Sequence, residues 1–172
     1  MRHFPNPPLI AIVLILGAVH LHAGEPQIPA ALQPLAPLAG ASWVADFPNG
    51  KARDTHHYSW VFNGKFLRDV HEVATLDGKV IYSGETIFAH DVETGKLVWW
   101  YWNSTGGYIT GDAETIGEVL RFNGENHADP KQPKQTRSEF AEITATSVIM
   151  RSYFLVDHQW KEQFAITFVK IE

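Results

Sequence analysis

The feature that most constrains the fold is a series of short extended segments separated by tight-turn sequences. DTHHYSWVF and KFLRDVHEVAT flank Asn63-Gly64, and residues 76–79 (LDGK) and 91–96 (DVETGK) provide two further turns. Asn-Gly is the dipeptide most typical of a type I′ hairpin turn. Residues 108–113 and 115–123 are expected to be two more separate strands. In total the pattern predicts about ten strands, joined mostly by hairpins.

A long antiparallel meander leaves two exposed edges unless the sheet closes on itself. We therefore predict an all-β fold, an up-and-down meander of about ten strands closed into a barrel, with a β-sandwich as the alternative. A short helical turn is expected before the strands, because Leu32, Leu35 and Leu38 recur every three residues. Pro34 and Pro37 exclude a long helix there.

The N-terminus has the layout of a secretory signal peptide. Residues 1–8 (MRHFPNPP) contain Arg2 and no acidic residue, residues 9–19 (LIAIVLILGAV) are apolar, and HLHA ends in a small residue. The apolar stretch is shorter than the roughly 20 residues of a membrane-spanning helix, so we expect cleavage rather than stable membrane insertion. Ala23 is the preferred cleavage position and Ala18 the alternative. The expected organisation is a signal peptide (1–23), a linker with the short helical segment (24–40) and a barrel domain (41–172).

Composition limits the function classes and the compartment. The formal net charge is −5 at pH 7, and the Lys and Arg residues form no long run, so nucleic-acid binding is disfavoured. The chain has no cysteine, which excludes disulfides and a lipid-modified cysteine. A secreted domain that depends on its core alone suits the bacterial periplasm better than a small extracellular module.

Three segments carry a family resemblance: LQPLAPLAGASW (32–43), YSWVFNGKFL (58–67) and IFAHDVETGKLVWWYWNSTGG (87–107). Together they resemble a bacterial domain-of-unknown-function family of calycin-like barrels, the class that includes lipocalins and fatty-acid-binding proteins. The resemblance implies a barrel with an internal cavity. Arg151-Ser-Tyr153 also has the form of the Arg-x-Tyr pair that holds a carboxylate in fatty-acid-binding proteins.

The aromatic segment LVWWYWN predicts which residues face inward. Successive side chains of a strand point to opposite faces, so Trp99 and Tyr101 share a face with Leu97, and Trp100 and Trp102 share the other. We expect the first pair inside the barrel and the second pair outside. A register error of one residue would exchange every inward residue for its neighbour. The expected cavity lining is Trp60, Phe66, Trp99, Tyr101, Tyr153 and Phe164, with Arg68 and Arg151 as polar anchors.

Histidines and acidic residues provide the other candidates for chemistry. His56, His71 and His90 lie on successive expected strands and could approach one another, but the histidines after residue 23 show no His-x-His or His-x-x-x-His spacing. We therefore predict no metal site and no cofactor, with the histidines solvated or singly hydrogen-bonded. Glu72 with His71 or Glu85 could form an acid–base pair. The alternative for Arg68, Glu72 and Glu85 is a solvated outer face.

These observations predict a secreted barrel that binds a small apolar or aromatic ligand. Two alternatives stay open. One is a cavity enzyme, isomerase- or hydrolase-like, that uses the Glu/His pair. The other is an interaction module that uses exposed Trp100 and Trp102, for example in a homodimer.

Overall fold

The computed structural model describes residues 27–127 and 131–171, which form one short 3-10 helix and ten β-strands. The predicted signal peptide lies outside the described residues. In chain order the elements are η1 (Ala30–Leu38), β1 (Ala41–Asp46), β2 (Ala52–Val61), β3 (Phe66–Thr75), β4 (Val80–His90), β5 (Leu97–Asn103), β6 (Tyr108–Ile116), β7 (Val119–Asn126), β8 (Gln135–Ala141), β9 (Ser147–Val156) and β10 (Gln159–Ile171).

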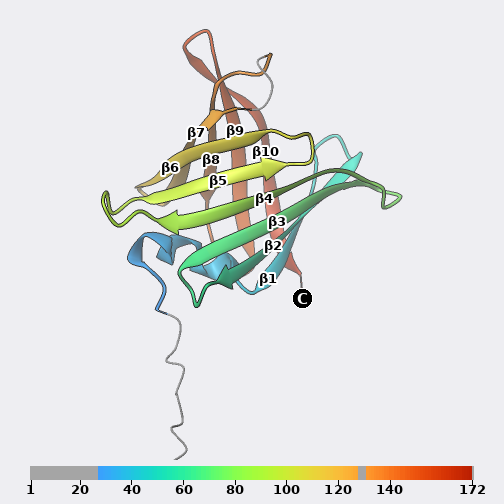
Figure 1. The fold of residues 1–172 in the computed structure, drawn as a ribbon. Helices are drawn as coiled ribbons and strands as arrows, with labels where there is room; N and C mark the ends of the chain where they lie inside the picture. Colours follow the sequence, from blue (N-terminus) through green and yellow to red (C-terminus); the bar gives the residue numbers. More distant parts are fainter. Residues whose placement is uncertain (1–26, 128–130, 172) are drawn as a thin grey trace, which may run out of the picture.

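The strands form one closed antiparallel barrel. Each strand pairs with its neighbours in the chain, and β1 also pairs with β10, with Trp43 opposite Lys170. Figure 1 shows β3–β6 crossing the front and β7–β10 continuing behind them. The predicted all-β meander and its closure are confirmed, and the β-sandwich alternative is wrong. Closure leaves no strand of this meander as an unpaired edge.

The backbone at two turns explains why one predicted hairpin is observed and why one predicted strand boundary is not. At the β2–β3 hairpin Asn63 and Gly64 have φ of 55° and 80°, the positive values that a type I′ turn needs at its two central positions. The division between residues 108–113 and 115–123 is wrong, because β6 continues to Ile116 and the chain reverses after it. Gly117, with φ of 61°, supplies the left-handed backbone at that reversal.

The expected helical turn is a 3-10 helix that packs into the hydrophobic core. A 3-10 helix repeats every three residues, so the spacing of Leu32, Leu35 and Leu38 places all three side chains on one face. All three are fully buried. The Trp43 indole Nε1 donates a 2.9 Å hydrogen bond to the Leu38 carbonyl, which ties the helix to β1. In the described part of the chain, no helix is long and apolar enough to cross a membrane.

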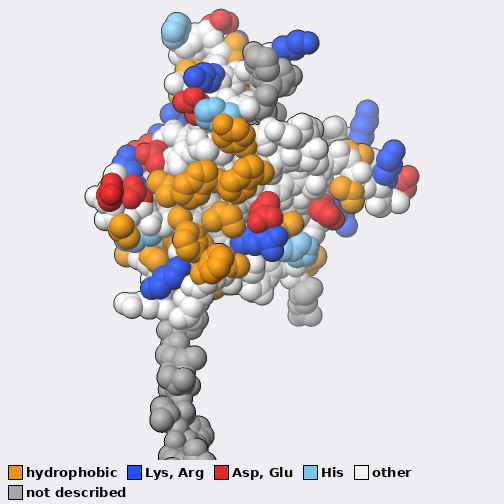
Figure 2. Space-filling model, viewed as in Figure 1, with side chains coloured by type: hydrophobic (Ala, Val, Ile, Leu, Met, Phe, Trp, Pro, Cys, Tyr) orange, Lys and Arg blue, Asp and Glu red, His pale blue; other side chains and the backbone are white. Residues whose placement is uncertain are grey.

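Buried and exposed side chains alternate along the strands, which separates the inside of the barrel from its surface. Along β2, Asp54, His56 and Tyr58 are buried, whereas the intervening His57 is exposed. Along β5, Trp99 is buried, while Trp100 and Trp102 are 39% and 47% exposed. Figure 2 shows hydrophobic side chains gathered on the outer face over the front strands. The two-sided aromatic character of β5 therefore supplies both a core wall and an outer surface.

Candidate functional site

The barrel encloses a cavity of about 300 Å³. Phe88, Trp99, Phe122 and Phe140 belong both to the buried core and to the wall of this cavity. Further apolar lining comes from Phe47, Val73, Ile109, Met150, Phe154 and Phe164. The titratable acid and imidazole groups of the wall come from β2 and β3, and hydroxyl groups come from β4, β5, β8 and β9. An apolar enclosure with a few converging polar groups is the usual composition of a small-molecule site.

Several residues that we expected in the cavity face inward. Trp99, Tyr101 and Phe164 line it directly. Trp60 is on the same face of β2 as His56 and Tyr58, but it packs against the core rather than lining the cavity. These positions follow the two-residue repeat of their strands.

The inward orientation expected for Phe66, Arg68, Arg151 and Tyr153 is corrected. On β3 the inward residues are Leu67, Asp69 and His71, so Phe66 and Arg68 take the outer face. On β9 Met150, Ser152 and Phe154 line the cavity, so Arg151 and Tyr153 alternate outward. Arg68 pairs with Glu85 at 2.8 Å and Arg151 with Glu162 at 3.3 Å, both in solvent-exposed positions. The sequence pattern was read one residue out of register on these strands.

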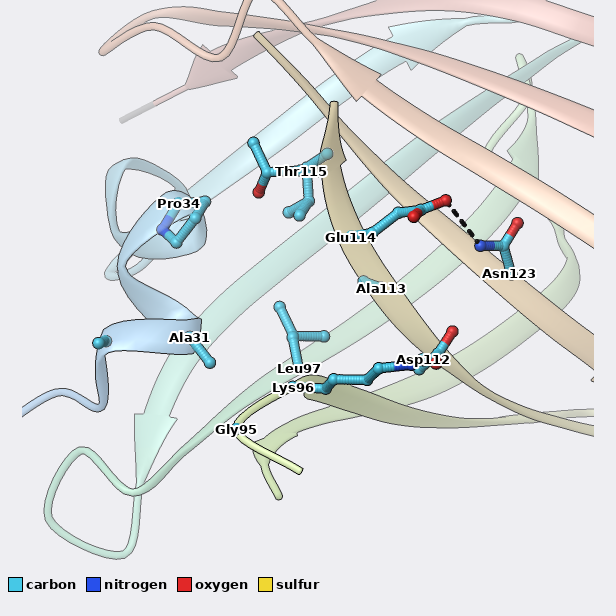
Figure 3. A pocket seen from close by; sticks show the side chains of 12 residues that line it. Ala31, Pro34, Gly95, Lys96, Leu97, Asp112, Ala113, Glu114, Thr115 and Asn123 are labelled. Atoms are coloured by element: carbon cyan, nitrogen blue, oxygen red, sulfur yellow. Dashed lines mark hydrogen bonds and ion pairs between the residues drawn. The ribbon is translucent and has the colours of Figure 1, made fainter. Parts of the chain in front are cut away.

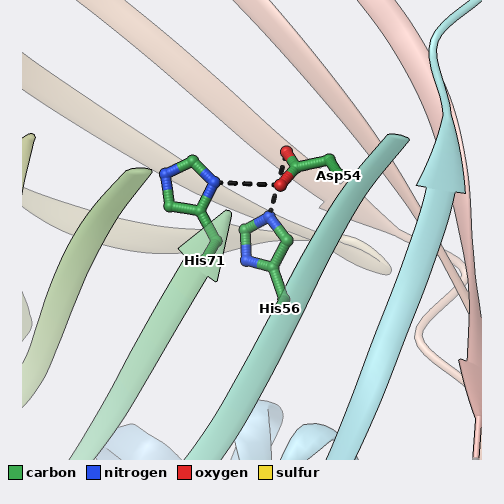
Figure 4. A group of neighbouring side chains, drawn as sticks. All are labelled: Asp54, His56 and His71. Atoms are coloured by element: carbon green, nitrogen blue, oxygen red, sulfur yellow. Dashed lines mark hydrogen bonds and ion pairs between the residues drawn. The ribbon is translucent and has the colours of Figure 1, made fainter. Parts of the chain in front are cut away.

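Four titratable residues form a buried cluster in the cavity wall. Asp54 and His56 come from β2, and Asp69 and His71 come from β3; His56 lies directly opposite His71 in the strand register. The relative exposure of all four residues is 9% or less. The two imidazole rings stack with their centroids 4.7 Å apart and their planes 19° apart. Figure 4 shows both rings directed at the Asp54 carboxylate.

His56 lies between two carboxylates. Its Nδ1 is 2.8 Å from Asp69 Oδ2, within hydrogen-bond geometry, and its Nε2 is 3.3 Å from Asp54 Oδ2, outside that geometry. Burial by itself lowers the pKa of His56, but Asp69 and Asp54 reverse this effect and raise that pKa to about 10. The imidazolium is therefore the charged partner of both carboxylates.

His71 connects Asp54 to two tyrosines. His71 Nδ1 is 3.0 Å from Asp54 Oδ1, and His71 Nε2 is 3.1 Å from the Tyr101 hydroxyl, which is 2.6 Å from the Tyr82 hydroxyl. Burial raises the pKa of Asp54, yet its contacts with His56 and His71 lower that pKa to about 2. Burial and the Tyr82 hydrogen bond raise the pKa of Tyr101, which keeps its phenol neutral. The chain of polar groups runs from the Asp54 carboxylate through His71 to the two tyrosine hydroxyls at the cavity.

Gly84 makes room for this chain of polar groups. It lies opposite His71 in the β3–β4 register. A Cβ at position 84 would lie 2.5 Å from the Tyr101 hydroxyl oxygen and 2.7 Å from His71 Nε2, both closer than van der Waals contact. A glycine in a strand often marks such a close approach.

The Gly84→Ala substitution is therefore expected to lower the free energy of unfolding by about 1–3 kcal/mol, because the added methyl group overfills the wall. Urea denaturation measures this change. Ser83→Ala, on the opposite face of the same strand, is the matched control and is expected to change stability by less than about 0.5 kcal/mol. A Gly84→Ala protein as stable as the wild type would show that the space is not needed.

Sequence reasoning found only half of this cluster. His56 and His71 were expected to approach each other, and they do; His90 is not part of the group. Asp54 and Asp69 were missed, although Asp-x-His recurs at 54–56 and 69–71. That repeat, on two strands joined by one hairpin, was the available signal.

The glutamates of the acid–base alternative do not reach the cavity. Glu72 is exposed on the outer face of β3. The Glu85 side chain is 39% exposed and pairs with Arg68 there. The two glutamates and His71 therefore lie on opposite sides of the barrel wall, and the solvated-face alternative is the correct one for Arg68, Glu72 and Glu85.

A second depression lies between η1 and residues of β5, β6 and β7 (Figure 3). It is larger, about 580 Å³, but its polar groups already pair with each other. Lys96 Nζ is 2.6 Å from Asp112 Oδ2, and Asn123 Nδ2 donates to Glu114 Oε1 at 3.4 Å. Charged side chains that are exposed to solvent and already paired with each other gain little by pairing with a ligand instead. The interior cavity, with its buried cluster, is the stronger candidate.

Fold and cavity together define the class of protein: a closed antiparallel ten-stranded β-barrel with a partly polar interior. The chain is similar to the crystal structure of Rv2717c from M. tuberculosis, with a TM-score of 0.61 and 15% sequence identity over 85% of this chain and 100% of that one. At this identity the similarity shows the fold alone. No protein-family model matches the sequence, and no curated protein sequence matches it.

Proposed function

We propose that the barrel binds a small, mainly apolar or aromatic molecule in its interior cavity. The observation that carries this proposal is the cavity of about 300 Å³, whose wall is largely apolar and rich in aromatic residues and contains a buried cluster of two aspartates and two histidines. That volume is at the lower end of the range for small-molecule pockets, so a compact ligand is favoured. The ligand's apolar body would contact Trp99, Phe122 and Phe154, and its polar end would face Asp54 and Tyr101.

We also propose that the protein is a secreted, calycin-like barrel of the bacterial periplasm. Support comes from the signal-peptide layout of residues 1–23, the absence of cysteine and the resemblance of the three segments described above. A periplasmic binding barrel would act on molecules that have already crossed the outer membrane.

A cavity-filling variant tests the binding function. Ser138 and Ser152 line the cavity from β8 and β9 and lie opposite each other in the register. Ser138→Phe would fill the space with a ring, and we expect it to weaken binding of the fluorescent apolar probe 1-aminoanthracene at least tenfold, because the ligand and the new ring cannot occupy one volume. Fluorescence titration measures the affinity.

Ser59→Phe is the matched control, because Ser59 is an exposed residue of β2. It adds the same ring to the outer surface and is expected to leave the affinity unchanged. Circular dichroism and thermal unfolding of both variants check that the barrel remains folded. Equal probe affinity in the wild type and in folded Ser138→Phe would contradict binding inside the barrel.

An interaction module remains the second candidate, and one specific observation favours it. Trp100, Trp102 and Tyr108 are 39%, 47% and 41% exposed on adjacent strands. Exposed aromatic residues of this kind are common at protein interfaces. A stable dimer in sedimentation experiments, lost when Trp100 and Trp102 are replaced by serine, would support this candidate.

A further inference from the structure

We propose that Asp54, His56 and His71 bind one divalent transition-metal ion in the cavity wall, with Zn²⁺ as the simplest occupant. One ligand atom from each of these three buried residues lies within 4.8 Å of the others. This inference goes beyond the proposed binding of an apolar molecule, because it concerns an inorganic ligand held by the protein's own side chains.

The distances within the group match a metal coordination sphere. Tetrahedral Zn²⁺ with bonds of about 2.0–2.1 Å places neighbouring ligand atoms roughly 3.3 Å apart. His56 Nε2 is 3.3 Å from Asp54 Oδ2, and His71 Nδ1 is 3.0 Å from the other oxygen of the same carboxylate, Oδ1. Binding of one ion therefore requires Asp54 to coordinate through both oxygens, or to rotate so that one oxygen serves both nitrogens. It also requires the two imidazole planes, now 19° apart, to tilt toward each other.

The other nitrogen of each imidazole already has an orienting partner. His56 Nδ1 bonds to Asp69, and His71 Nε2 bonds to the Tyr101 hydroxyl. Metal-binding histidines almost always use their second nitrogen in this way, with a carboxylate as a common partner. Asp69 and Tyr101 thus direct His56 Nε2 and His71 Nδ1 toward Asp54.

An independent observation indicates a missing ligand. Among the described residues, His56 Nε2 is the one buried side-chain nitrogen or oxygen without a hydrogen-bond partner. The His56 side chain is 8% exposed, and its Nε2 is directed at Asp54 in the cavity wall. Buried polar atoms are rarely left unsatisfied, and an ion is one common reason for an exception.

The charge balance also favours a divalent cation. Asp54 and Asp69 are 4% and 3% exposed. Within the described part of the chain, neither carboxylate pairs with a lysine or an arginine, and the cavity lining contains neither residue type. Two buried carboxylates are costly without matching positive charge, and in the metal-free protein one imidazolium, His56, faces both of them. One M²⁺ ion bound in its place, beside two neutral imidazoles, supplies two positive charges for the two carboxylates.

The donor set indicates which ions would bind and what the site would do. Two imidazoles and one carboxylate suit Zn²⁺, Fe²⁺ or Co²⁺ better than Ca²⁺ or Mg²⁺, which prefer oxygen ligands. Three protein ligands leave at least one coordination position open. Because the three residues line the cavity, that position would take an oxygen or nitrogen donor of a molecule bound there.

Isothermal titration of the metal-free full-length protein with Zn²⁺ tests the site. We expect one Zn²⁺ per chain, and His56→Gln and His71→Gln should each weaken binding by at least about 100-fold, which exceeds the usual effect of losing an orienting partner. Asp69→Asn, which changes only such a partner, should weaken it about 10- to 100-fold. His57→Gln is the matched control, because His57 is the next residue on β2 and is exposed on the opposite face.

Co²⁺ titration of the unmodified protein keeps the test valid if a variant fails to fold. We expect intense visible ligand-field bands and selective paramagnetic shifts of the His56 and His71 ring signals by NMR. No binding by the wild type, or binding that His56→Gln and His71→Gln leave unchanged, would overturn the proposal. Probe binding with 1-aminoanthracene in a chelator is a separate measurement, so failure of the metal site is distinguishable from failure of the apolar cavity.

Discussion

Replacement of His56 by leucine is expected to lower the free energy of unfolding by about 3–5 kcal/mol, the usual cost of removing one partner from a buried ion pair. The substitution leaves Asp54 and Asp69 in a low-dielectric wall without the imidazolium that lies 2.8 Å from Asp69. Loss of the ring also removes its contact with Phe168, whose centroid is 4.7 Å away. Chemical denaturation of the metal-free protein measures the change.

A double variant separates the charge effect from the loss of packing. His56→Leu with Asp69→Leu also removes the carboxylate nearest to the lost imidazolium, so we expect it to be more stable than His56→Leu alone. His57→Leu, on the outer face, should cost less than about 1 kcal/mol. If the double variant is less stable than His56→Leu, the account of the cluster as a charge-paired unit is wrong.

The stability of the metal-free protein is expected to fall as the pH rises from about 6.5 to about 10. The pKa of His56 is raised from 6.5 to about 10 on folding, so its stabilising effect is complete below the unfolded value and disappears through the folded one. The contribution of Asp54 to stability depends on pH in the opposite direction. Its pKa is lowered from 3.8 to about 2 on folding, so its stabilising effect is lost as the pH falls through that range. The cluster therefore stabilises the fold most between about pH 4 and pH 6.5.

Denaturation in the presence of a chelator at a series of pH values checks this expectation. We expect a loss on the order of a few kcal/mol between pH 6.5 and pH 10, since one pKa unit corresponds to about 1.4 kcal/mol. His56→Gln should flatten this part of the profile and leave the rest in place. The same slope in the wild type and in His56→Gln would show that another group is responsible.

The fold was predictable because local signals agreed with one another. Asn63-Gly64 fits the positive φ values at its hairpin, and the three-residue spacing of Leu32, Leu35 and Leu38 matches a 3-10 helix. The predicted strand boundary between residues 113 and 115 was wrong. Threonine and isoleucine are both common in strands, so the residues before Gly117 do not show where β6 ends; its end depends on pairing with β7. Antiparallel closure then followed from the number of consecutive hairpins.

The site was less predictable, because the register of the strands determines which side chains face the cavity and which of them lie side by side. Arg68 and Arg151 were placed inward as anchors, yet both pair with glutamates on the outer face. Asp54 and Asp69 were missed because buried carboxylates contradict the usual preference for exposure. Their position is tolerated only because His56 and His71 lie beside them, and that juxtaposition requires the β2–β3 register.

The most direct test of the central claim is a crystal structure of the wild-type protein with 1-aminoanthracene. We predict electron density for one probe molecule inside the barrel, in contact with Trp99 and Phe122, with its amine toward Asp54 and Tyr101. Density confined to the outer face at Trp100 and Trp102, with the interior unchanged, would contradict the claim that this barrel is a binding cavity.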